Sequence, residues 1–283
     1  MNSISPQSDE RELGGHKLMW HRWHPKDFDY KGAFFLLHGL GDYGQRYQEL
    51  ADFFLTQGIA FATCDLPGHG LSQGKRGHIP SWKIIKEISE HGLAEARALV
   101  PGKPIGFGGH SAGGLLALFL LGELQSRPDF SWISSPLLNP RAEQPRWKYN
   151  LVRNFSYLFP SMTLSTGVTA EMCRRNTKQE KAEHFGQFHS QVSLHFARIL
   201  VEIAEVVQTQ PEHLPSPLPL LITQGKSDPA CSYQFCEELV ARLQREDLQL
   251  ILYPDARHEP FADESKEEVM LDLAQWFAKI LQT

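Results

Sequence analysis

Residues 108–114 read Gly108-Gly109-His110-Ser111-Ala112-Gly113-Gly114, a run that contains the pattern Gly-x-Ser-x-Gly. A short apolar stretch with Ile105 and Phe107 precedes this run, and an apolar block from Leu115 to Leu121 follows it. This context is typical of a strand that enters the serine and a helix that leaves it. We therefore predict a sharp strand-to-helix turn that presents the Ser111 hydroxyl above the edge of a sheet.

The glycines on either side of the serine have a steric explanation. A residue on so sharp a turn has an unfavourable backbone conformation and crowds its neighbours, and Gly109 and Gly113 have no Cβ to clash. At the start of the helix, the backbone N–H of Ala112 would point at an oxyanion formed beside the serine. These features predict that Ser111 is a nucleophile. The alternative is a glycine-rich turn with a purely structural role.

The composition limits the function classes. The chain has 283 residues, 41% hydrophobic and 22% charged, with a net charge of −5. This length allows one large core with an inserted subdomain. The sequence lacks the clustered basic face of a nucleic-acid-binding domain, so we expect no nucleic-acid partner. Residues 1–15 do not resemble a signal peptide, and no apolar block is long enough to cross a bilayer. We therefore expect a cytoplasmic location.

The cysteines and histidines lack the spacing of metal ligands. The four cysteines do not form ligand pairs, and a chain of this size does not need disulfides, so free thiols in a reducing compartment are expected. The thirteen histidines are scattered, without a His-Glu-x-x-His pattern. We therefore expect no metal site and no cofactor.

Short apolar strands alternate with amphipathic helices in the first half of the chain and again near its end. The first two strands, 10–13 and 18–24, flank Gly14-Gly15, a hairpin signal. Further strands are expected at 34–37, 59–64, 130–134, 218–224 and 248–253, and one with Ile105 and Phe107 runs into Ser111; helices are expected between them, with a last helix through 269–280. This alternation predicts an α/β fold with a mostly parallel sheet covered by helices on both faces.

The alternation breaks between Pro136 and about Pro211, where no clear strand is evident. Two amphipathic stretches, 151–158 and 192–206, show helical spacing instead. Within residues 141–185 there are eight Lys or Arg and four Glu, a net charge of +4 in an acidic protein. We predict a helical cap at 136–210 that is inserted into a core made of 1–135 and 211–283.

A serine hydroxyl is a poor nucleophile at neutral pH and needs a base that an acid orients. In an α/β sheet with this turn, the acid and then the base follow the serine in chain order, at the carboxyl ends of later strands. Asp228 is the predicted acid, against the alternative of a simple Asp-Pro turn. His258 is the predicted base, against the alternative of a surface histidine. The competing acids, Asp255 and Asp263, are expected to be loop and helix-cap residues.

A second N–H donor for the oxyanion is expected in the loop after the third strand, His38-Gly39-Leu40-Gly41. Leu40 would donate its backbone N–H beside that of Ala112, while His38 is expected to brace the loop. The segment 65–72 also contains Asp, His and Ser, but its glycines and proline favour a structural turn.

These motifs together resemble the α/β-hydrolase superfamily, and most closely its monoacylglycerol lipase and lysophospholipase group, of the serine aminopeptidase S33 type. The resemblance covers residue 14 to the end and rests on the motifs 38–41, Arg46-Tyr47, 65–72, 109–114, Gly225-x-x-Asp228 and His258-Glu259. It implies an eight-stranded sheet with a helical cap after the sixth strand. It also implies a carboxylic ester substrate with one long acyl chain.

The expected reaction is hydrolysis of a monoacylglycerol to fatty acid and glycerol through an acyl-enzyme on Ser111. The alternatives are a lysophospholipase or a short-chain carboxylesterase, and then an aminopeptidase or a non-catalytic binding protein. An aminopeptidase would need an acidic cluster in the cap, which is basic here, and a binding protein would have lost part of the triad. A serine at the turn excludes dehalogenase and epoxide hydrolase chemistry, which needs a carboxylate there.

The cap is the expected source of the acyl pocket, with Phe155, Leu158, Phe159 and Met162 as candidate lining residues. The alternative is that these four side chains bury the cap against the core. The positive charge of the cap is compatible with transient contact with an anionic membrane surface, but so small a net charge favours a solvated face. The sequence identifies no residues that recognise the head group and does not determine the oligomeric state.

Overall fold

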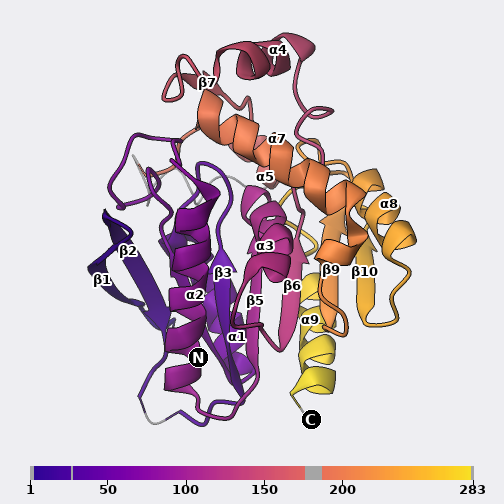
Figure 1. Ribbon diagram of the computed structural model, residues 1–283. Helices are drawn as coiled ribbons and strands as arrows, with labels where there is room; N and C mark the ends of the chain where they lie inside the picture. Colours follow the sequence, from indigo (N-terminus) through magenta and orange to yellow (C-terminus); the bar gives the residue numbers. More distant parts are fainter. Residues whose placement is uncertain (1–2, 27, 176–186, 282–283) are drawn as a thin grey trace.

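The computed structural model describes residues 3–26, 28–175 and 187–281. Eight strands form one sheet in the order β1-β2-β4-β3-β5-β6-β9-β10 (Figure 1). Their bounds are β1 Gln7–Leu13, β2 His16–Trp23, β3 Gly32–Leu37, β4 Ile59–Cys64, β5 Ile105–His110, β6 Phe130–Ser134, β9 Leu220–Gly225 and β10 Leu248–Tyr253. β2 is antiparallel to both β1 and β4, and all other pairs are parallel. The expected eight-stranded, mostly parallel sheet is confirmed.

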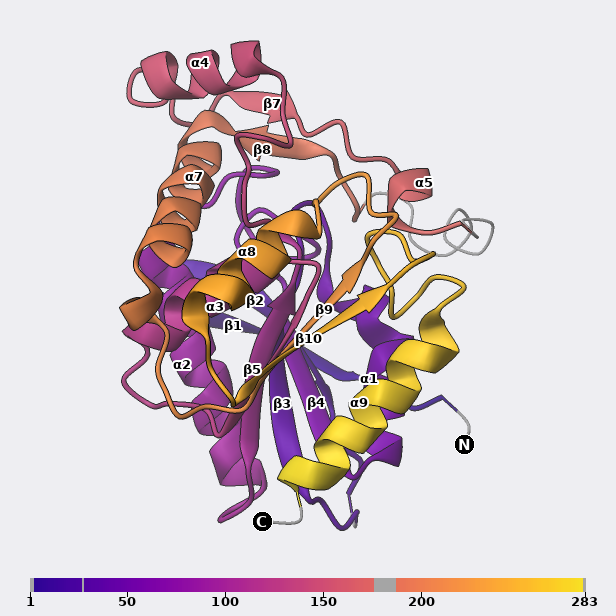
Figure 2. The same cartoon turned by 90° about the vertical axis from the view of Figure 1, so that its right-hand side faces the viewer.

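Helices cover both faces of the sheet, which explains why the central strands β3, β5, β6 and β9 are buried along their whole length. One face carries α1 (Gln48–Thr56), which continues the 3₁₀ helix η1 (Gly44–Tyr47), and α9 (Lys266–Ile280) (Figure 2). The other face carries α2 (Trp82–Leu99), α3 (Ala112–Glu123) and α8 (Gln234–Leu243). Each face has its own buried cluster, and β3 contributes to both, with Phe35 on the α2–α3 side and Phe34 on the α1–α9 side.

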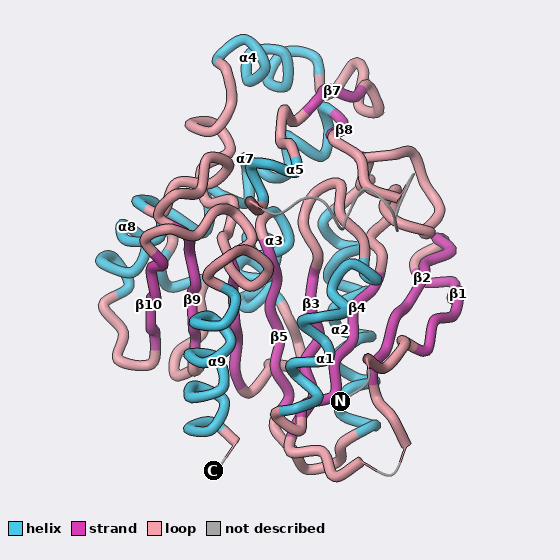
Figure 3. Tube along the Cα trace, turned by 180° about the vertical axis from the view of Figure 1, so that it is seen from behind, coloured by secondary structure: helices cyan, strands magenta, loops and turns pink. Residues whose placement is uncertain are grey.

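The segment between β6 and β9 forms a cap over the carboxyl ends of the parallel strands (Figures 1 and 3). Its elements are α4 (Arg146–Phe155), β7 (Thr163–Ser165), α5 (Ala170–Cys173), β8 (Gln191–Ser193) and α7 (Leu194–Thr209), followed by the 3₁₀ helix η2 (Pro211–His213). α7 is the long helix of the cap, and it packs against α3 of the core and α4 of the cap. The cap therefore follows the sixth strand, where the sequence places it.

The expectation that the cap has no strand is wrong. β7 and β8 pair antiparallel, with Thr163 opposite Ser193 and Ser165 opposite Gln191. A strand of three residues is too short to show an alternating pattern in the sequence. The helical stretches were also predicted too long, because Leu158 lies beyond the end of α4 and Val192 lies in β8.

The strand β8 and the residues before it lie directly on two core loops. The N–H of His189 donates to Gly41 O at 2.9 Å, and that of Ser193 donates to Gly77 O at 2.8 Å. A Cβ on Gly41 would lie 1.8 Å from His189 O, and one on Gly77 would lie 2.1 Å from Gln191 O. Glycine is therefore needed at both positions, which also have positive φ angles of 77° and 71°.

All four cysteines are buried free thiols, as expected. Across the residues described above, no helix combines the length and the apolar character that crossing a membrane requires.

Candidate active site

Ser111 lies between the end of β5 and the first residue of α3, as predicted. Its φ of 56° and ψ of −122° are rare for a residue with a side chain and cost on the order of 1–3 kcal/mol. A Cβ on Gly109 would lie 2.3 Å from Gly113 O, and a Cβ on Gly113 would lie 2.2 Å from Leu37 O. The steric explanation for both glycines therefore holds in the structure.

The structure brings Ser111, His258 and Asp228 into one hydrogen-bonded chain. His258 Nε2 lies 2.8 Å from Ser111 Oγ, and His258 Nδ1 lies 2.7 Å from Asp228 Oδ2. The three residues follow β5, β10 and β9, whose carboxyl ends meet at the same edge of the sheet. An ionised carboxylate can only accept hydrogen bonds, so His258 Nδ1 carries the proton that is donated to Asp228. His258 Nε2 is therefore the ring atom that accepts the serine proton.

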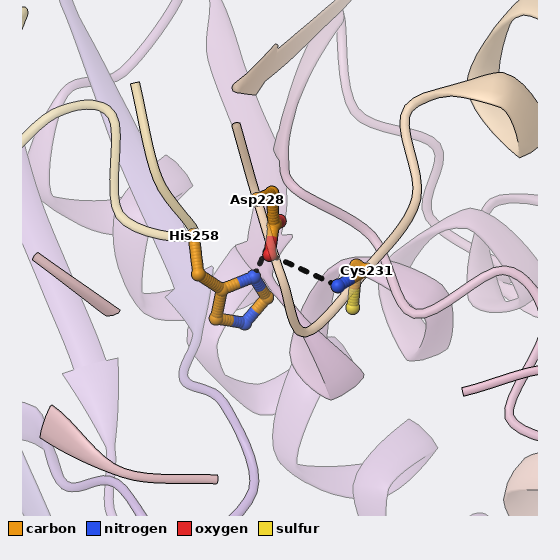
Figure 4. A group of neighbouring side chains, drawn as sticks. All are labelled: Asp228, Cys231 and His258. Carbon is orange, nitrogen blue, oxygen red and sulfur yellow. Dashed lines mark hydrogen bonds and ion pairs between the residues drawn. The ribbon is translucent and has the colours of Figure 1, made fainter. Parts of the chain in front are cut away.

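The surroundings of Asp228 keep its carboxylate ionised and fixed. Oδ1 accepts the N–H group of Ala230 at 2.7 Å and that of Cys231 at 3.0 Å. Figure 4 shows the bond from Cys231. Oδ2 accepts from His258 and from Gln224 Nε2 at 2.8 Å. Burial alone would raise the pKa of Asp228, but the charge of His258 and these hydrogen bonds lower it overall.

His258 is buried, and burial alone would lower its pKa. The charge of Asp228 and the hydrogen bond to it outweigh this effect, so the pKa of His258 is raised above 6.5. Among the described residues, no hydrogen bond joins the neighbouring His110 ring, whose centroid lies 4.8 Å away, to a carboxylate. Burial, followed by the charge of His258, lowers the pKa of His110 to about 3, so this ring is neutral at pH 7.

Asp228, His258 and Cys231 form a compact group whose potential ligand atoms lie within 4.8 Å of one another (Figure 4). It is the one group of this kind in the described part of the chain. Burial and the charge of Asp228 raise the pKa of the Cys231 thiol, which therefore stays protonated. Both carboxylate oxygens of Asp228 already accept hydrogen bonds. The donor set is thus that of a hydrogen-bonded acid–base pair rather than of a metal site.

Leu40 and Ala112, the predicted oxyanion donors, lie beside the serine. Ala112 is the first residue of α3, so its N–H has no intrahelical acceptor. Across the described residues, no hydrogen bond uses the N–H of Leu40. The preceding Gly39 is so close to Ser111 that a Cβ on Gly39 would lie 3.3 Å from the serine Cβ.

His38 braces this loop, as expected. Its Nδ1 donates to Gly39 O at 2.8 Å, and its Nε2 accepts the N–H of Leu66 at 2.9 Å. The segment 65–72 is a structural turn, also as expected, because the carboxylate of Asp65 accepts the N–H groups of Gly44 and Leu71 at 2.6 and 2.8 Å. Asp263 accepts the N–H groups of Arg175 and Arg257 and does not contact His258.

A cavity lies between the cap and the edge of the sheet, with Ser111 and His258 in its wall. It encloses about 1100 Å³, including its open mouth. Most of the wall is apolar and comes from both the core and the cap: Leu40, Leu137, Val152, Leu164, Val168, Val192, Ala197, Leu200 and Val201. Polar wall residues include Glu143, Gln144 and Lys148. Glu143 is half-buried and accepts the N–H of Ser232 at 2.9 Å, and burial raises its pKa.

The four residues predicted to form the acyl pocket do not line this cavity. Phe155, Leu158, Phe159 and Met162 are 40%, 70%, 54% and 39% exposed. They do not bury the cap against the core either. α4 ends at Phe155, and the turn that follows carries the other three outward.

The residues of α7 that line the cavity were not predicted, because this helix carries two apolar stripes and the sequence does not show which of them faces the cavity. The stripe of Phe196, Ile199 and Ile203 packs into the core. The second stripe, Ala197, Leu200 and Val201, faces the cavity and has the i, i+3, i+4 spacing that could have identified it.

Comparisons with known proteins agree with this geometry. The family model described as "Serine aminopeptidase, S33" matches residues 29–265. The chain is 25% identical over 281 residues to a monoacylglycerol lipase of Mycolicibacterium smegmatis, covering 95% of each protein. It is 27% identical over 259 residues to an uncharacterised abhydrolase domain-containing protein of Dictyostelium discoideum, covering 87% of this chain but only 26% of that protein.

Among solved structures, a soluble variant of the monoglyceride lipase of Saccharomyces cerevisiae, in complex with a substrate analogue, superposes with a TM-score of 0.87. That structure is 19% identical in sequence and covers 99% of this chain and 97% of its own, which shows a shared fold. The sheet order, the cap after the sixth strand and the serine turn are those of an α/β-hydrolase, and the chain belongs to the serine aminopeptidase S33 family of that fold.

Proposed function

We propose that this protein is a serine carboxylic-ester hydrolase that cleaves a lipid ester with one acyl chain, and that monoacylglycerol is its substrate. One observation carries the proposal: the hydrogen-bonded chain Ser111–His258–Asp228 opens into a cavity with a mostly apolar wall. The names of the Mycolicibacterium and yeast relatives support the same substrate class. In this proposal, residues 136–210 act as a cap on a hydrolase core made of 1–135 and 211–283.

The reaction begins when Ser111 Oγ attacks the ester carbonyl and His258 Nε2 takes the hydroxyl proton. Asp228 holds the imidazole in the required tautomer and stabilises the imidazolium. The N–H groups of Leu40 and Ala112 donate to the oxyanion, and each such donor is worth about 3 kcal/mol. His258 then returns the proton to the departing alcohol oxygen, which leaves glycerol and an acyl-enzyme on Ser111.

Water completes the cycle. His258, neutral again, takes a proton from a water molecule as the water oxygen attacks the acyl-enzyme carbonyl. The same backbone donors stabilise the second oxyanion. Collapse of this intermediate breaks the bond to Ser111 Oγ, which recovers its proton from His258, and the fatty acid is released.

The cavity wall suits an acyl chain, because each buried methylene contributes about 0.8 kcal/mol of transfer free energy. Glu143 and Gln144 provide hydrogen-bonding groups in that wall for the hydroxyls of a small polyol. An aminopeptidase would need carboxylates to bind the substrate amine. Among the described carboxylates in the wall, Asp42 and Glu259 are paired with Arg46. This leaves Glu143 as the candidate for binding the amine of an aminopeptidase substrate.

We also propose that the cap docks transiently on an anionic lipid surface. A contiguous stretch of the cap exposes large hydrophobic side chains: Trp147, Phe155, Tyr157, Leu158, Phe159 and Met162. Arg146 and Arg153 are exposed in the same stretch. Apolar side chains that insert between lipids, flanked by cations that attract anionic headgroups, are typical of an interfacial segment.

The test is to measure initial rates on three substrates: 1-monooleoylglycerol, oleoyl-lysophosphatidylcholine and an aminoacyl p-nitroanilide, with Ser111→Ala as the blank. We expect the glyceride to be cleaved and Ser111→Ala to lose on the order of 10⁶-fold in kcat. Cleavage of the lysolipid alone would replace the proposal with a lysophospholipase. Cleavage of the anilide alone would favour an aminopeptidase, and retention of a few per cent of activity in Ser111→Ala would refute Ser111 as the nucleophile.

A further inference from the structure

Glu259, next to the proposed base, is a buried carboxylate that the mechanism above does not use. Its side chain is 2% exposed and is held by two arginines from different parts of the molecule. Arg46 binds it with two hydrogen bonds, Nη1 to Oε1 at 2.6 Å and Nη2 to Oε2 at 2.9 Å. Arg174 donates from Nε to Oε2 at 2.9 Å. Burial alone would raise the pKa of Glu259, but Arg46 and then Arg174 lower it, so the carboxylate is charged at neutral pH.

Arg46 connects this carboxylate to the loop that carries Leu40. It lies in η1, directly after that loop, and its Nη1 is also 3.4 Å from Asp42 Oδ2. Asp42 in turn accepts the hydroxyl of Tyr47 at 2.8 Å, and its own N–H donates to Gly39 O at 3.2 Å. The position of Arg46 is therefore coupled through Asp42 to the backbone on either side of Leu40.

Arg174 connects the same carboxylate to the cap. It directly follows α5, and the backbone there pairs with the loop that carries the base. The N–H of Glu259 donates to Cys173 O at 2.9 Å, and the N–H of His258 lies 3.4 Å from Met172 O. The loop of His258 therefore contacts the cap through both its backbone and the side chain of Glu259.

We propose that Glu259 is a positioning residue: through Arg46 and Arg174, its carboxylate fixes the loop of His258 relative to the loop of Leu40 and to the cap segment 170–174. The inference rests on the proposed function, because it assigns to Glu259 the role of fixing the position of the proposed base, His258, relative to the proposed oxyanion donor, Leu40. A small displacement between two such groups lowers the rate steeply, since a misplacement of about 1 Å can cost on the order of 10²-fold in rate.

The charge of Glu259 provides a readout that a purely structural role would not give. Among the described residues, the charged and titratable groups around His258 include Asp228, Glu259, Arg46, His110 and Glu143, together with the protonated thiol of Cys231. Asp228 and Glu259 raise the pKa of His258, whereas Arg46 opposes them. Replacing Glu259 with the isosteric glutamine removes one negative charge and leaves the arginines. The pKa of His258 therefore falls, and the acid limb of kcat/KM moves to lower pH.

The experiment compares Glu259→Gln, Arg174→Gln and the double variant on p-nitrophenyl butyrate, a soluble ester that needs no lipid surface. We expect Glu259→Gln to lower kcat on the order of tenfold to a hundredfold, with KM within about twofold of the wild-type value. Arg174→Gln should cause a smaller loss. The double variant should be no slower than Glu259→Gln, because both single changes break the same connection, the one between Arg174 and Glu259.

Glu264→Gln is the matched control. Glu264 pairs with Arg175 at 2.9 Å at the same junction, but the pair is exposed, and within the described residues no ion pair joins Glu264 to Arg46 or Arg174. This variant should keep both the wild-type kcat and the wild-type pH profile. An unchanged kcat and pH profile in Glu259→Gln would overturn the inference. A double variant whose loss of kcat equals the product of the two single losses would also overturn it.

An NMR titration of the His258 ring, with and without Glu259→Gln in the Ser111→Ala protein, tests the same coupling without any substrate. If the wild-type protein hydrolyses no ester, the proposed function fails. If the pKa of His258 measured by NMR is then the same with and without Glu259→Gln, the inference is overturned as well. If Glu259→Gln does not fold, Arg174→Gln decides, with Arg174→Lys expected to recover part of the lost rate because it keeps the charge. Full activity in Arg174→Gln would then overturn the link to the cap.

Discussion

Asp228 shows how one residue controls the state of another. Within the described residues, its carboxylate accepts four hydrogen bonds, one of which comes from His258. The other three fix the carboxylate, so the orientation of the imidazole follows from the fold of the loop after β9. Without the negative charge, the imidazole would lose both its tautomer preference and its partner as a cation.

We expect Asp228→Asn to lower kcat about 10⁴-fold, the size of loss found when a serine triad loses its acid. Initial rates on the preferred ester provide the measurement. Asp255→Asn is the matched control, because Asp255 lies in the same loop region as His258 but is exposed. An equal loss in both variants would contradict the assignment of Asp228 as the orienting acid.

The pH dependence follows from the raised pKa of His258. The base must be neutral to accept the serine proton, so activity falls as the pH drops through the pKa of the free enzyme. Because Asp228 raises that pKa above 6.5, we expect the acid limb of kcat/KM to have its midpoint above pH 6.5. A profile between pH 4 and 9 on a soluble ester tests this expectation. A midpoint well below 6.5 would contradict it.

At the scale of elements, the serine turn depends on how closely α3 approaches β3. Gly113 belongs to α3, and a Cβ there would lie 2.2 Å from Leu37 O and 2.4 Å from His38 O. Both are backbone atoms next to the loop of Leu40, so the helix cannot move without disturbing the proposed oxyanion site.

We expect Gly113→Ala to lower the free energy of unfolding on the order of 3 kcal/mol and to abolish most of the activity. Urea denaturation gives the first quantity. Gly102→Ala is the control, because Gly102 has a positive φ of 74° but an added Cβ meets no atom within 4 Å. That variant should cost about 1 kcal/mol of backbone strain and leave the rate unchanged. Equal destabilisation of the two variants would rule out the steric explanation.

The exposed end of α4 and the turn after it form a second element with its own test. Leu158→Ser and Phe159→Ser should each weaken binding to vesicles that contain phosphatidylserine by about tenfold, because each removes apolar area that would be buried between lipids. Co-sedimentation measures the binding. Leu271→Ser is the control, since Leu271 is 58% exposed on α9, which belongs to the core and not to the cap. Unchanged binding in the two cap variants would contradict the docking proposal.

At the scale of the whole molecule, the cavity exists because two separately encoded parts meet. The core supplies Ser111, His258 and Leu40, while α7 and the short strands of the cap supply most of the apolar wall. Glycines at 41 and 77 let the cap lie directly on the core loops. The acyl pocket is thus a property of the assembled chain and not of the cap alone.

Filling this cavity should separate long substrates from short ones. Val201 faces it from α7, and Val201→Phe adds volume where an acyl chain would lie. We expect kcat/KM for 1-monooleoylglycerol to fall at least about tenfold, while p-nitrophenyl acetate is cleaved at the wild-type rate, because a steric change of this size is worth about 1–3 kcal/mol. Equal losses on both substrates would show that the variant disturbs the triad instead.

The sequence by itself determined the sheet, the place of the cap and the candidate triad. Parallel strands that are buried on both faces are mostly apolar, the serine turn needs glycines at fixed offsets, and the carboxyl ends of the strands meet at one edge. These are local requirements, so β4, β6 and β10 could be predicted to the residue, and Ser111, Asp228 and His258 could be matched by their positions after strands.

Only the tertiary structure decided which cap residues line the cavity and what Glu259 contacts. An apolar side chain on an amphipathic helix can face the core, the cavity or the solvent, and the sequence does not distinguish them. Phe155, Leu158, Phe159 and Met162 proved to be exposed, while Leu164 and Leu200 line the cavity. Likewise, Arg46 and Glu259 are separated by 213 positions in the chain, and their contact arises only when the loops after β3 and β10 meet beneath the cap.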